Sequence, residues 1–178
     1  MSGRLFMQEA AILEIIQGMA QVTRRHLEQR GRRDPALVGI HTGGVWVARH
    51  LAEALGVTTP LGELDISFYR DDFTRIGMHP QVRPSNIPFD VEERHIVLVD
   101  DVIQSGRTIR AAMNEIFDFG RPASILLVTL VERNGRELPI QPDVVGLQPT
   151  LEAHEHLRLT GPEPLAIHIE PAPGGRRR

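Results

Sequence analysis

The chain has 178 residues, enough for one domain with a sizeable core, and its 41% hydrophobic and 24% charged residues are typical of a globular protein. It contains no cysteine, which excludes disulfides, thiolate metal sites and cysteine nucleophiles. Its apolar runs are too short to span a bilayer and its first residues show no secretory pattern, so we expect a cytoplasmic protein that does not enter membranes. A net charge of −3 argues against a surface that binds nucleic acid throughout.

The first elements alternate between helix and strand. Apolar side chains at helical spacing predict an amphipathic helix from about Phe6 to Gln29. The short apolar segment Ala36–Ile40 predicts a buried strand, and helical spacing returns over Val47–Leu55, with Gly56 as the natural stop of that helix. Leu61–Tyr69 partly alternates between apolar and polar residues, which predicts a second strand.

Arg70–Phe89 has a different character. It contains three prolines and no apolar periodicity, so we expect a long mobile loop. Loops of this length in a compact domain usually have a function.

The second half repeats the alternation. Ile96–Val99 is continuously apolar, which predicts a strand covered on both faces. Gly106–Phe119 carries one apolar stripe and predicts a helix, followed by strands over Ile125–Val131 and Asp143–Leu147. Leu165–Ile169 is a further short strand candidate.

This order predicts an α/β fold, an open, mostly parallel twisted sheet with helices on both faces. We expect a single domain over residues 1–170 and a disordered tail over Pro171–Arg178, which is rich in proline, glycine and arginine. Ligands bind such sheets at the carboxyl ends of the strands, so the site should involve the loops after Ile40, Tyr69, Val99 and Val131.

One segment carries a clear chemical signal. Asp100 and Asp101 follow a predicted buried strand, and Ser105-Gly106-Arg107-Thr108 opens a helix four residues on. Backbone N–H groups, two hydroxyls and a helix N-terminus then converge, which favours a phosphate as ligand. Taken alone, the Ser105–Thr108 turn is a common way to start a helix. Taken alone, an acidic pair after a strand is also common, as a metal site or a helix cap. Their combination favours a site in which the carboxylates accept hydrogen bonds from two neighbouring ribose hydroxyls.

Val97–Thr108 (VLVDDVIQSGRT) resembles the 5-phosphoribosyl-1-pyrophosphate motif of type I phosphoribosyltransferases. The resemblance implies the fold of that family, with a small hood built from the chain ends over the site. It implies that Asp100 and Asp101 are the catalytic pair that holds the ribose 2′ and 3′ hydroxyls. It places the 5′-phosphate in the loop that follows, whose substrate-binding residues are Val102, Ile103, Gln104, Ser105, Gly106, Arg107 and Thr108.

Two further stretches, Gly62–Asp72 (GELDISFYRDD) and Val131–Asp143 (VERNGRELPIQPD), are similar to the family of bifunctional pyrimidine-operon regulators and uracil phosphoribosyltransferases. This resemblance implies that uracil displaces pyrophosphate from 5-phosphoribosyl-1-pyrophosphate to give UMP. Mg²⁺ would arrive with the sugar diphosphate, and no protein side chains are predicted to form a metal cage. His154 and His156 are more typical of a surface than of a metal site.

The pyrophosphate loop is expected at Thr42-Gly43-Gly44, although Gly43 stands where a familiar member has arginine. A simple strand-to-helix turn is compatible with this interpretation. The Arg70–Phe89 loop matches the family's flexible lid, in which Arg70 is a candidate contact to pyrophosphate.

The base pocket is expected near the strand that ends at Val131. Arg133 and Arg136 are candidates for contacts to the base or the phosphate. Equally, either could be a surface residue that pairs with Glu132 or Glu137.

The family's regulatory role implies binding to the leader of pyrimidine-gene messenger RNA, with Arg24, Arg25 and His26 of the first helix as candidate contacts. A solvated basic surface is the alternative. The chain departs from the familiar members at Gly135, where they have histidine, and it has no lysine. Three functions stay open: an active uracil phosphoribosyltransferase, a non-catalytic RNA-binding sensor of UMP, and a phosphoribosyltransferase for another base. A homodimer or homotetramer is expected from the resemblance alone.

Overall fold

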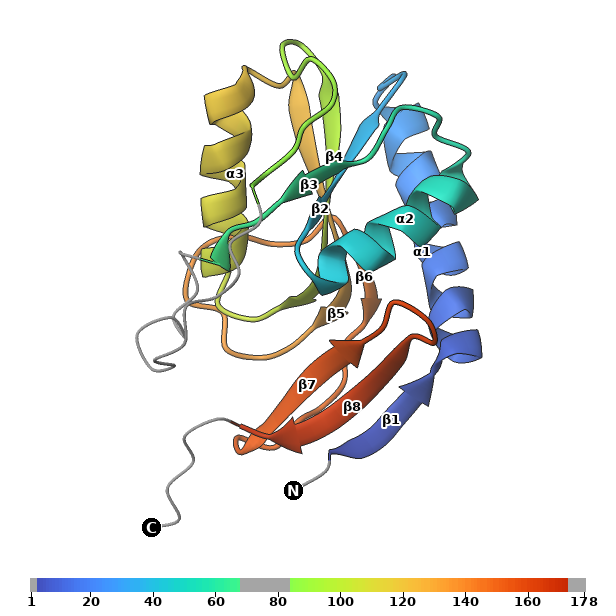
Figure 1. Cartoon of the computed structure of the whole chain (residues 1–178), viewed down its shortest axis with the longest axis vertical. Coiled ribbons are helices and arrows are strands. Elements are labelled where there is room, and N and C mark those ends of the chain that lie inside the picture. The colour runs from blue at the N-terminus through green and yellow to red at the C-terminus, as the bar shows by residue number, and fades with distance from the viewer. Residues whose placement is uncertain (1–2, 68–83, 173–178) are drawn as a thin grey trace.

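The computed structural model describes residues 3–67 and 84–172, and these form two sheets with three helices (Figure 1). In chain order the elements are β1 (Arg4–Gln8), α1 (Glu9–Gln29), β2 (Ala36–Ile40), α2 (Gly43–Leu55), β3 (Gly62–Leu64), β4 (His95–Ile103), α3 (Arg107–Phe119), β5 (Ser124–Glu132), β6 (Val144–Leu147), β7 (Glu155–Thr160) and β8 (Ala166–Pro171). None of the helices in this described part is both long and apolar enough to cross a membrane.

The larger sheet has five parallel strands in the order β3-β2-β4-β5-β6. Helices α1 and α2 cover one face and α3 covers the other (Figure 1). Successive residues of β4 explain this arrangement, since Val97 and Val99 pack with α1 and α2 while Ile96 and Leu98 pack with α3. The predicted parallel sheet with helices on both faces is therefore confirmed.

The smaller sheet is antiparallel, in the order β1-β8-β7, and combines the two ends of the described chain. Its buried residues, among them Leu157, Leu159 and Ile167, belong to the same apolar cluster as α1 and α2. This sheet is the predicted hood, and Figure 1 shows it beneath the carboxyl ends of the larger sheet.

Two parts of the hood were not predicted correctly. Residues Arg4–Gln8 form a strand, and the first helix begins only at Glu9, whereas we expected it from about Phe6. The strand exists because Arg4 pairs with Ile169, a partner too distant in the chain for a local pattern to show. Strand β7 was also missed, although Leu157 and Leu159 alternate with polar residues in it.

Strand β3 is shorter than the predicted Leu61–Tyr69. It ends at Leu64, and the carboxylate of Asp65 then accepts a hydrogen bond from the Ser67 N–H at 3.0 Å, which turns the chain out of the sheet. The chain returns at Asn86, which exchanges two backbone hydrogen bonds of 2.8 Å with Glu63. Most of the predicted lid, including Arg70, lies outside the described residues.

Strand β4 is longer than the predicted Ile96–Val99. Its pairing with β5 continues to Val102 and Ile103, so Asp100 and Asp101 lie within the strand rather than after it. Strand β8 reaches Pro171, the first residue of the predicted tail, and residues 173–178 lie outside the described part.

Candidate active site

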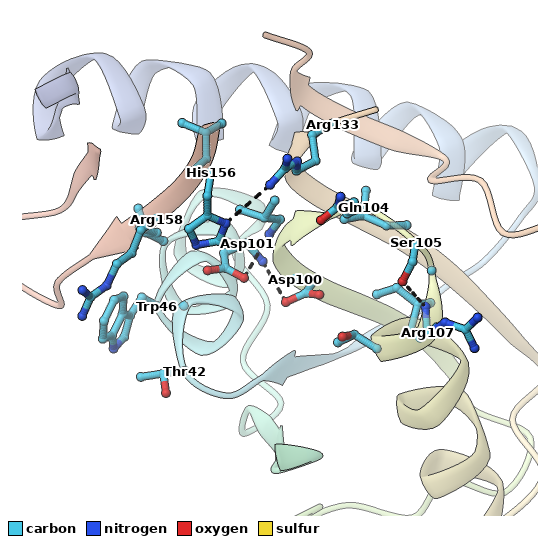
Figure 2. Close-up of a pocket in the computed structure, with 18 residues that line it drawn as sticks. Thr42, Trp46, Asp100, Asp101, Gln104, Ser105, Arg107, Arg133, His156 and Arg158 are labelled. Atoms are coloured by element: carbon cyan, nitrogen blue, oxygen red, sulfur yellow. Dashed lines mark hydrogen bonds between the residues drawn. The ribbon is translucent and has the colours of Figure 1, made fainter. Parts of the chain in front are cut away.

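A cavity of about 580 Å³ opens at the carboxyl ends of β2 and β4. From these two strands the chain proceeds to opposite sides of the sheet, to β3 and to β5, so the cavity lies at the topological switch point where such folds bind ligands. Figure 2 shows how its walls converge from α2, β4, the start of α3, the end of β5 and the hood strand β7. The lining residues are Thr42, Gly43, Trp46, residues 100–109, Arg133 and residues 156–159.

The acidic pair lies on one wall of this cavity, and the backbone orients both carboxylates. Asp100 is only 1% exposed. Its Oδ1 accepts a hydrogen bond from the Asp101 N–H at 3.0 Å, and Asp101 Oδ1 accepts one from the Val102 N–H at 2.9 Å. These bonds fix both side chains before any ligand arrives, which is the preorganisation that electrostatic catalysis needs.

The predicted pyrophosphate loop is packed against the acidic pair. A Cβ atom at Gly43 would lie 2.7 Å from Asp101 Cγ, and one at Gly44 would lie 2.8 Å from the Val99 carbonyl oxygen. A side chain at Gly43 would therefore displace Asp101, and one at Gly44 would collide with the backbone of β4. Thr42 and Gly43 line the cavity, while Gly44 lies behind them, and α2 already begins at Gly43. Its N-terminus, with unpaired N–H groups, thus adjoins the cavity.

The predicted phosphate loop forms the opposite wall. Ser105 Oγ accepts a hydrogen bond from the Arg107 N–H at 3.2 Å, and helix α3 begins at Arg107. Gly106 has a φ of +92°, a left-handed conformation that favours glycine. The Arg107 guanidinium forms an ion pair with Glu137 at 2.8 Å, beside the loop.

Arg133 and Arg136 differ in their surroundings. Arg133 lines the cavity, donates to the Glu155 carbonyl oxygen at 3.0 Å and approaches His156 Nδ1 at 3.4 Å, which joins the end of β5 to the hood. Burial lowers the pKa of Arg133 below its usual value. Arg136 lies outside this cavity and pairs with Glu132 at 2.5 Å, one of the alternatives considered for it.

Several lining residues were not among the predicted site residues. Trp46 comes from the first turns of α2, and a Cβ at Gly161 would lie 3.0 Å from its ring, so the indole also packs against the hood turn. His156 and Arg158 enter from β7, although the histidine was expected at the surface. The alternation of Leu157 and Leu159 with polar residues was the sequence signal that could have revealed this strand.

The predicted RNA-binding residues lie near the end of α1. Arg24 and Arg25 are exposed, and His26 is half-buried. Arg24 Nη2 donates to the Ala54 carbonyl oxygen at 3.0 Å, so part of its hydrogen-bonding capacity serves the end of α2. Among residues 3–67 and 84–172, no group of three or more histidine, aspartate and glutamate side chains is placed to hold a metal ion.

Solved structures share this architecture. The hypoxanthine phosphoribosyltransferase of Trypanosoma cruzi superposes with a TM-score of 0.65 at 20% identity, covering 86% of this chain and 85% of that one. A purine phosphoribosyltransferase from Pyrococcus horikoshii superposes with a TM-score of 0.60 at 21% identity, covering 82% and 87%. At these identities the structural likeness establishes the fold of this chain but does not identify a nucleobase substrate. The family model for the phosphoribosyl transferase domain matches residues 8–159, a range that includes every residue lining the cavity. The chain is therefore a phosphoribosyltransferase domain.

Relatives of much higher identity narrow this class. The bifunctional protein PyrR of Pseudomonas fluorescens is 59% identical over 157 residues, covering 88% of this chain and 94% of that protein. The bifunctional protein PyrR of Pseudomonas paraeruginosa is 60% identical over 154 residues, covering 86% and 91%. The chain therefore belongs to the PyrR family of phosphoribosyltransferases.

Proposed function

We propose that this protein is a uracil phosphoribosyltransferase that also regulates pyrimidine biosynthesis genes. One observation carries the enzymatic part: the oriented pair Asp100 and Asp101 shares a cavity at the switch point of the sheet with the glycine-containing loop of residues 104–108. The choice of uracil and the regulatory part are supported by 59% identity to a bifunctional PyrR protein.

In the proposed reaction, N1 of uracil forms a bond to the anomeric carbon and its proton passes to solvent. The bond from that carbon to pyrophosphate breaks, and pyrophosphate leaves with the bonding electron pair. Positive charge develops on the ribose ring, as in glycoside chemistry. Asp100 and Asp101 accept hydrogen bonds from the ribose hydroxyls and stabilise that charge, because their carboxylates are held by backbone N–H groups. Ser105, Gly106 and the N-terminus of α3 hold the 5′-phosphate.

Mg²⁺ fits this proposal as an ion that enters with the substrate. The chemistry of the cavity wall suits it, since Asp100 and Asp101 offer carboxylate oxygens, the ligands that Mg²⁺ prefers, but too few for a complete cage. Asp101 would contribute to holding the ion beside the ribose hydroxyls. The bound ion would neutralise charge on the departing pyrophosphate.

In this proposal the base lies beside Arg133, between the end of β5 and the hood strand β7. Arg133 is held there by its hydrogen bond to the Glu155 carbonyl oxygen at 3.0 Å. Thr42 and Gly43 would bind the pyrophosphate together with Arg70 of the predicted lid. A cytoplasmic location and a homodimer or homotetramer belong to the same proposal.

A base-by-base assay tests the enzymatic part. The protein is incubated with Mg²⁺, 5-phosphoribosyl-1-pyrophosphate and either uracil, cytosine, hypoxanthine or guanine, and nucleotide is measured by chromatography. We expect UMP from uracil and little product from the other bases. Turnover of a purine alone would show a phosphoribosyltransferase for another base, and tight UMP binding without turnover would show a sensor.

The variant Asp101→Asn tests the role of the acidic pair in the same assay. It keeps the size of the side chain but removes its negative charge, so turnover should fall by roughly 100-fold, the scale of removing one preorganised electrostatic interaction. Unchanged turnover would remove the acidic pair from the proposed mechanism.

The regulatory part predicts RNA binding that depends on UMP. We expect a pyrimidine-leader RNA to be retained on filters by the protein with UMP and to be retained weakly without it. The double variant Arg24→Ala/Arg25→Ala should bind the RNA more weakly. In a plot of log affinity against log salt concentration, its slope should be smaller in magnitude by about one for each phosphate group that the protein no longer neutralises. Absence of UMP-dependent binding at moderate salt would contradict the regulatory role by this route.

A further inference from the structure

The segment of residues 133–138 lies along the outer side of the phosphate loop and holds its backbone. The Arg133 N–H donates to the Ile103 carbonyl oxygen at 3.0 Å. The N–H groups of Glu137 and Leu138 both donate to the Ser105 carbonyl oxygen, at 3.1 and 3.0 Å. Two of three consecutive loop carbonyls are therefore fixed by backbone hydrogen bonds.

The carbonyl between them is held by a side chain. Arg136 Nη1 donates to the Gln104 carbonyl oxygen at 2.8 Å, and Nη2 donates to Glu132 Oε1 at 2.5 Å. Glu132 is itself fixed, because it also accepts hydrogen bonds from Gln148 at 2.5 Å and from Gln141 at 3.1 Å. The side chains of Arg136 and Glu132 are only 22% and 12% exposed, so solvent screens this ion pair weakly.

This arrangement determines which groups of the loop are available to an anion. In a trans peptide the N–H points opposite to the C=O. Since the carbonyls of Ile103, Gln104 and Ser105 are all held by residues 133–138, the N–H groups of Gln104, Ser105 and Gly106 point away from that segment. These three residues line the cavity. If the Gln104 carbonyl were released, its peptide plane could rotate and present a carbonyl dipole to a bound phosphate, which would weaken binding.

The close packing of Gly135 supports the same role. Gly135 has a φ of +110°, and a Cβ atom there would lie 3.1 Å from Gln104 Nε2. Absence of a side chain at Gly135 therefore lets the two segments approach closely enough for Arg136 to reach the Gln104 carbonyl.

We propose that Arg136 is a positioning residue for the phosphoribosyl group: it fixes the Gln104–Ser105 peptide so that the loop presents N–H groups to the 5′-phosphate. It acts from outside the cavity, through Gln104. The inference rests on the proposed function, because it assumes that this loop holds the phosphate.

The test uses Arg136→Met, which keeps an unbranched apolar stem but removes the donors, and Arg136→Lys, which keeps the charge. Binding of ribose 5-phosphate is measured by calorimetry, and kinetics are measured with 5-phosphoribosyl-1-pyrophosphate and uracil. We expect Arg136→Met to weaken ribose 5-phosphate binding and to raise the KM for the sugar diphosphate by about tenfold or more, the scale of one charge-assisted hydrogen bond. The KM for uracil, measured at saturating sugar diphosphate, should change much less, and Arg136→Lys should restore part of the loss.

The matched control is Arg110→Met, because Arg110 is an exposed arginine of α3. It should bind ribose 5-phosphate like the unmodified protein. Should Arg136→Met fail to fold, Arg136→Lys carries the test, since its single ammonium replaces the two separate nitrogens with which Arg136 bonds Gln104 and Glu132. Undiminished ribose 5-phosphate binding by the folded Arg136 variants would overturn the positioning role and leave the proposed function intact. If the unmodified protein did not bind ribose 5-phosphate at all, the phosphate site itself would be wrong, and the inference would fall with it.

Discussion

Gly43 is the residue at which the loop before α2 packs most closely against Asp101 of the acidic pair. A Cβ atom there would lie 2.7 Å from Asp101 Cγ and 2.9 Å from Asp101 Cβ. Rotation of the Asp101 side chain would relieve the first contact but not the second. A side chain at this position is therefore incompatible with the position of Asp101 in this chain.

The substitution Gly43→Ala should displace Asp101 and reduce kcat/KM by roughly 100-fold, the scale expected when a reacting group moves by about 1 Å. Gly18→Ala is the matched control, because Gly18 lies in α1 with nothing near its Cβ position. It should keep full activity and raise the free energy of unfolding by about 0.5–1 kcal/mol. Equal activity of the two variants would show that Asp101 tolerates displacement.

Among the elements, strand β7 links the hood to the active site. Its inward residue Leu157 is 1% exposed in the main apolar cluster, while neighbouring His156 and Arg158 line the cavity. Arg133 donates to the Glu155 carbonyl oxygen at the start of the strand. Packing of one strand thus supports both the core and the wall of the site.

Leu157→Ala should lower the free energy of unfolding by about 2–5 kcal/mol, the usual cost of removing a buried leucine side chain. Leu5→Ala is the control from the same sheet, since Leu5 is 47% exposed, and it should change stability by less than about 0.5 kcal/mol. Both are measured by urea denaturation followed by circular dichroism. A small effect of Leu157→Ala would mean that the hood folds independently of this side chain.

The elements also show where sequence patterns suffice. Strands β2, β4 and β5 were predicted because a strand buried on both faces is continuously apolar, as in Ala36–Ile40. Strand β1 was missed because it pairs with β8 at the other end of the chain, and such pairing leaves little local signal in a short strand. Strand β7 was missed although Leu157 and Leu159 alternate with polar residues in it. The end of β4 was placed too early because Asp100 and Asp101 are unusual in a strand.

At the scale of the whole molecule, the cavity wall formed by residues 100–108 could be predicted from the sequence and the hood side could not. The segment around Asp100 to Thr108 is continuous in sequence and has a recognisable pattern. His156 and Arg158 reach the cavity only because the hood folds back over the carboxyl ends of the sheet. The support of the phosphate loop by Arg136 likewise depends on a contact between two loops that are distant in the chain.

The position of Trp46 has a practical consequence. The chain contains a single tryptophan, and its ring lines the cavity on one side and packs against Gly161 of the hood on the other. All tryptophan fluorescence of the unmodified protein therefore comes from one indole that lies beside both the cavity and the hood. Stopped-flow emission measurements can thus time the order of substrate arrival and product departure without any attached dye.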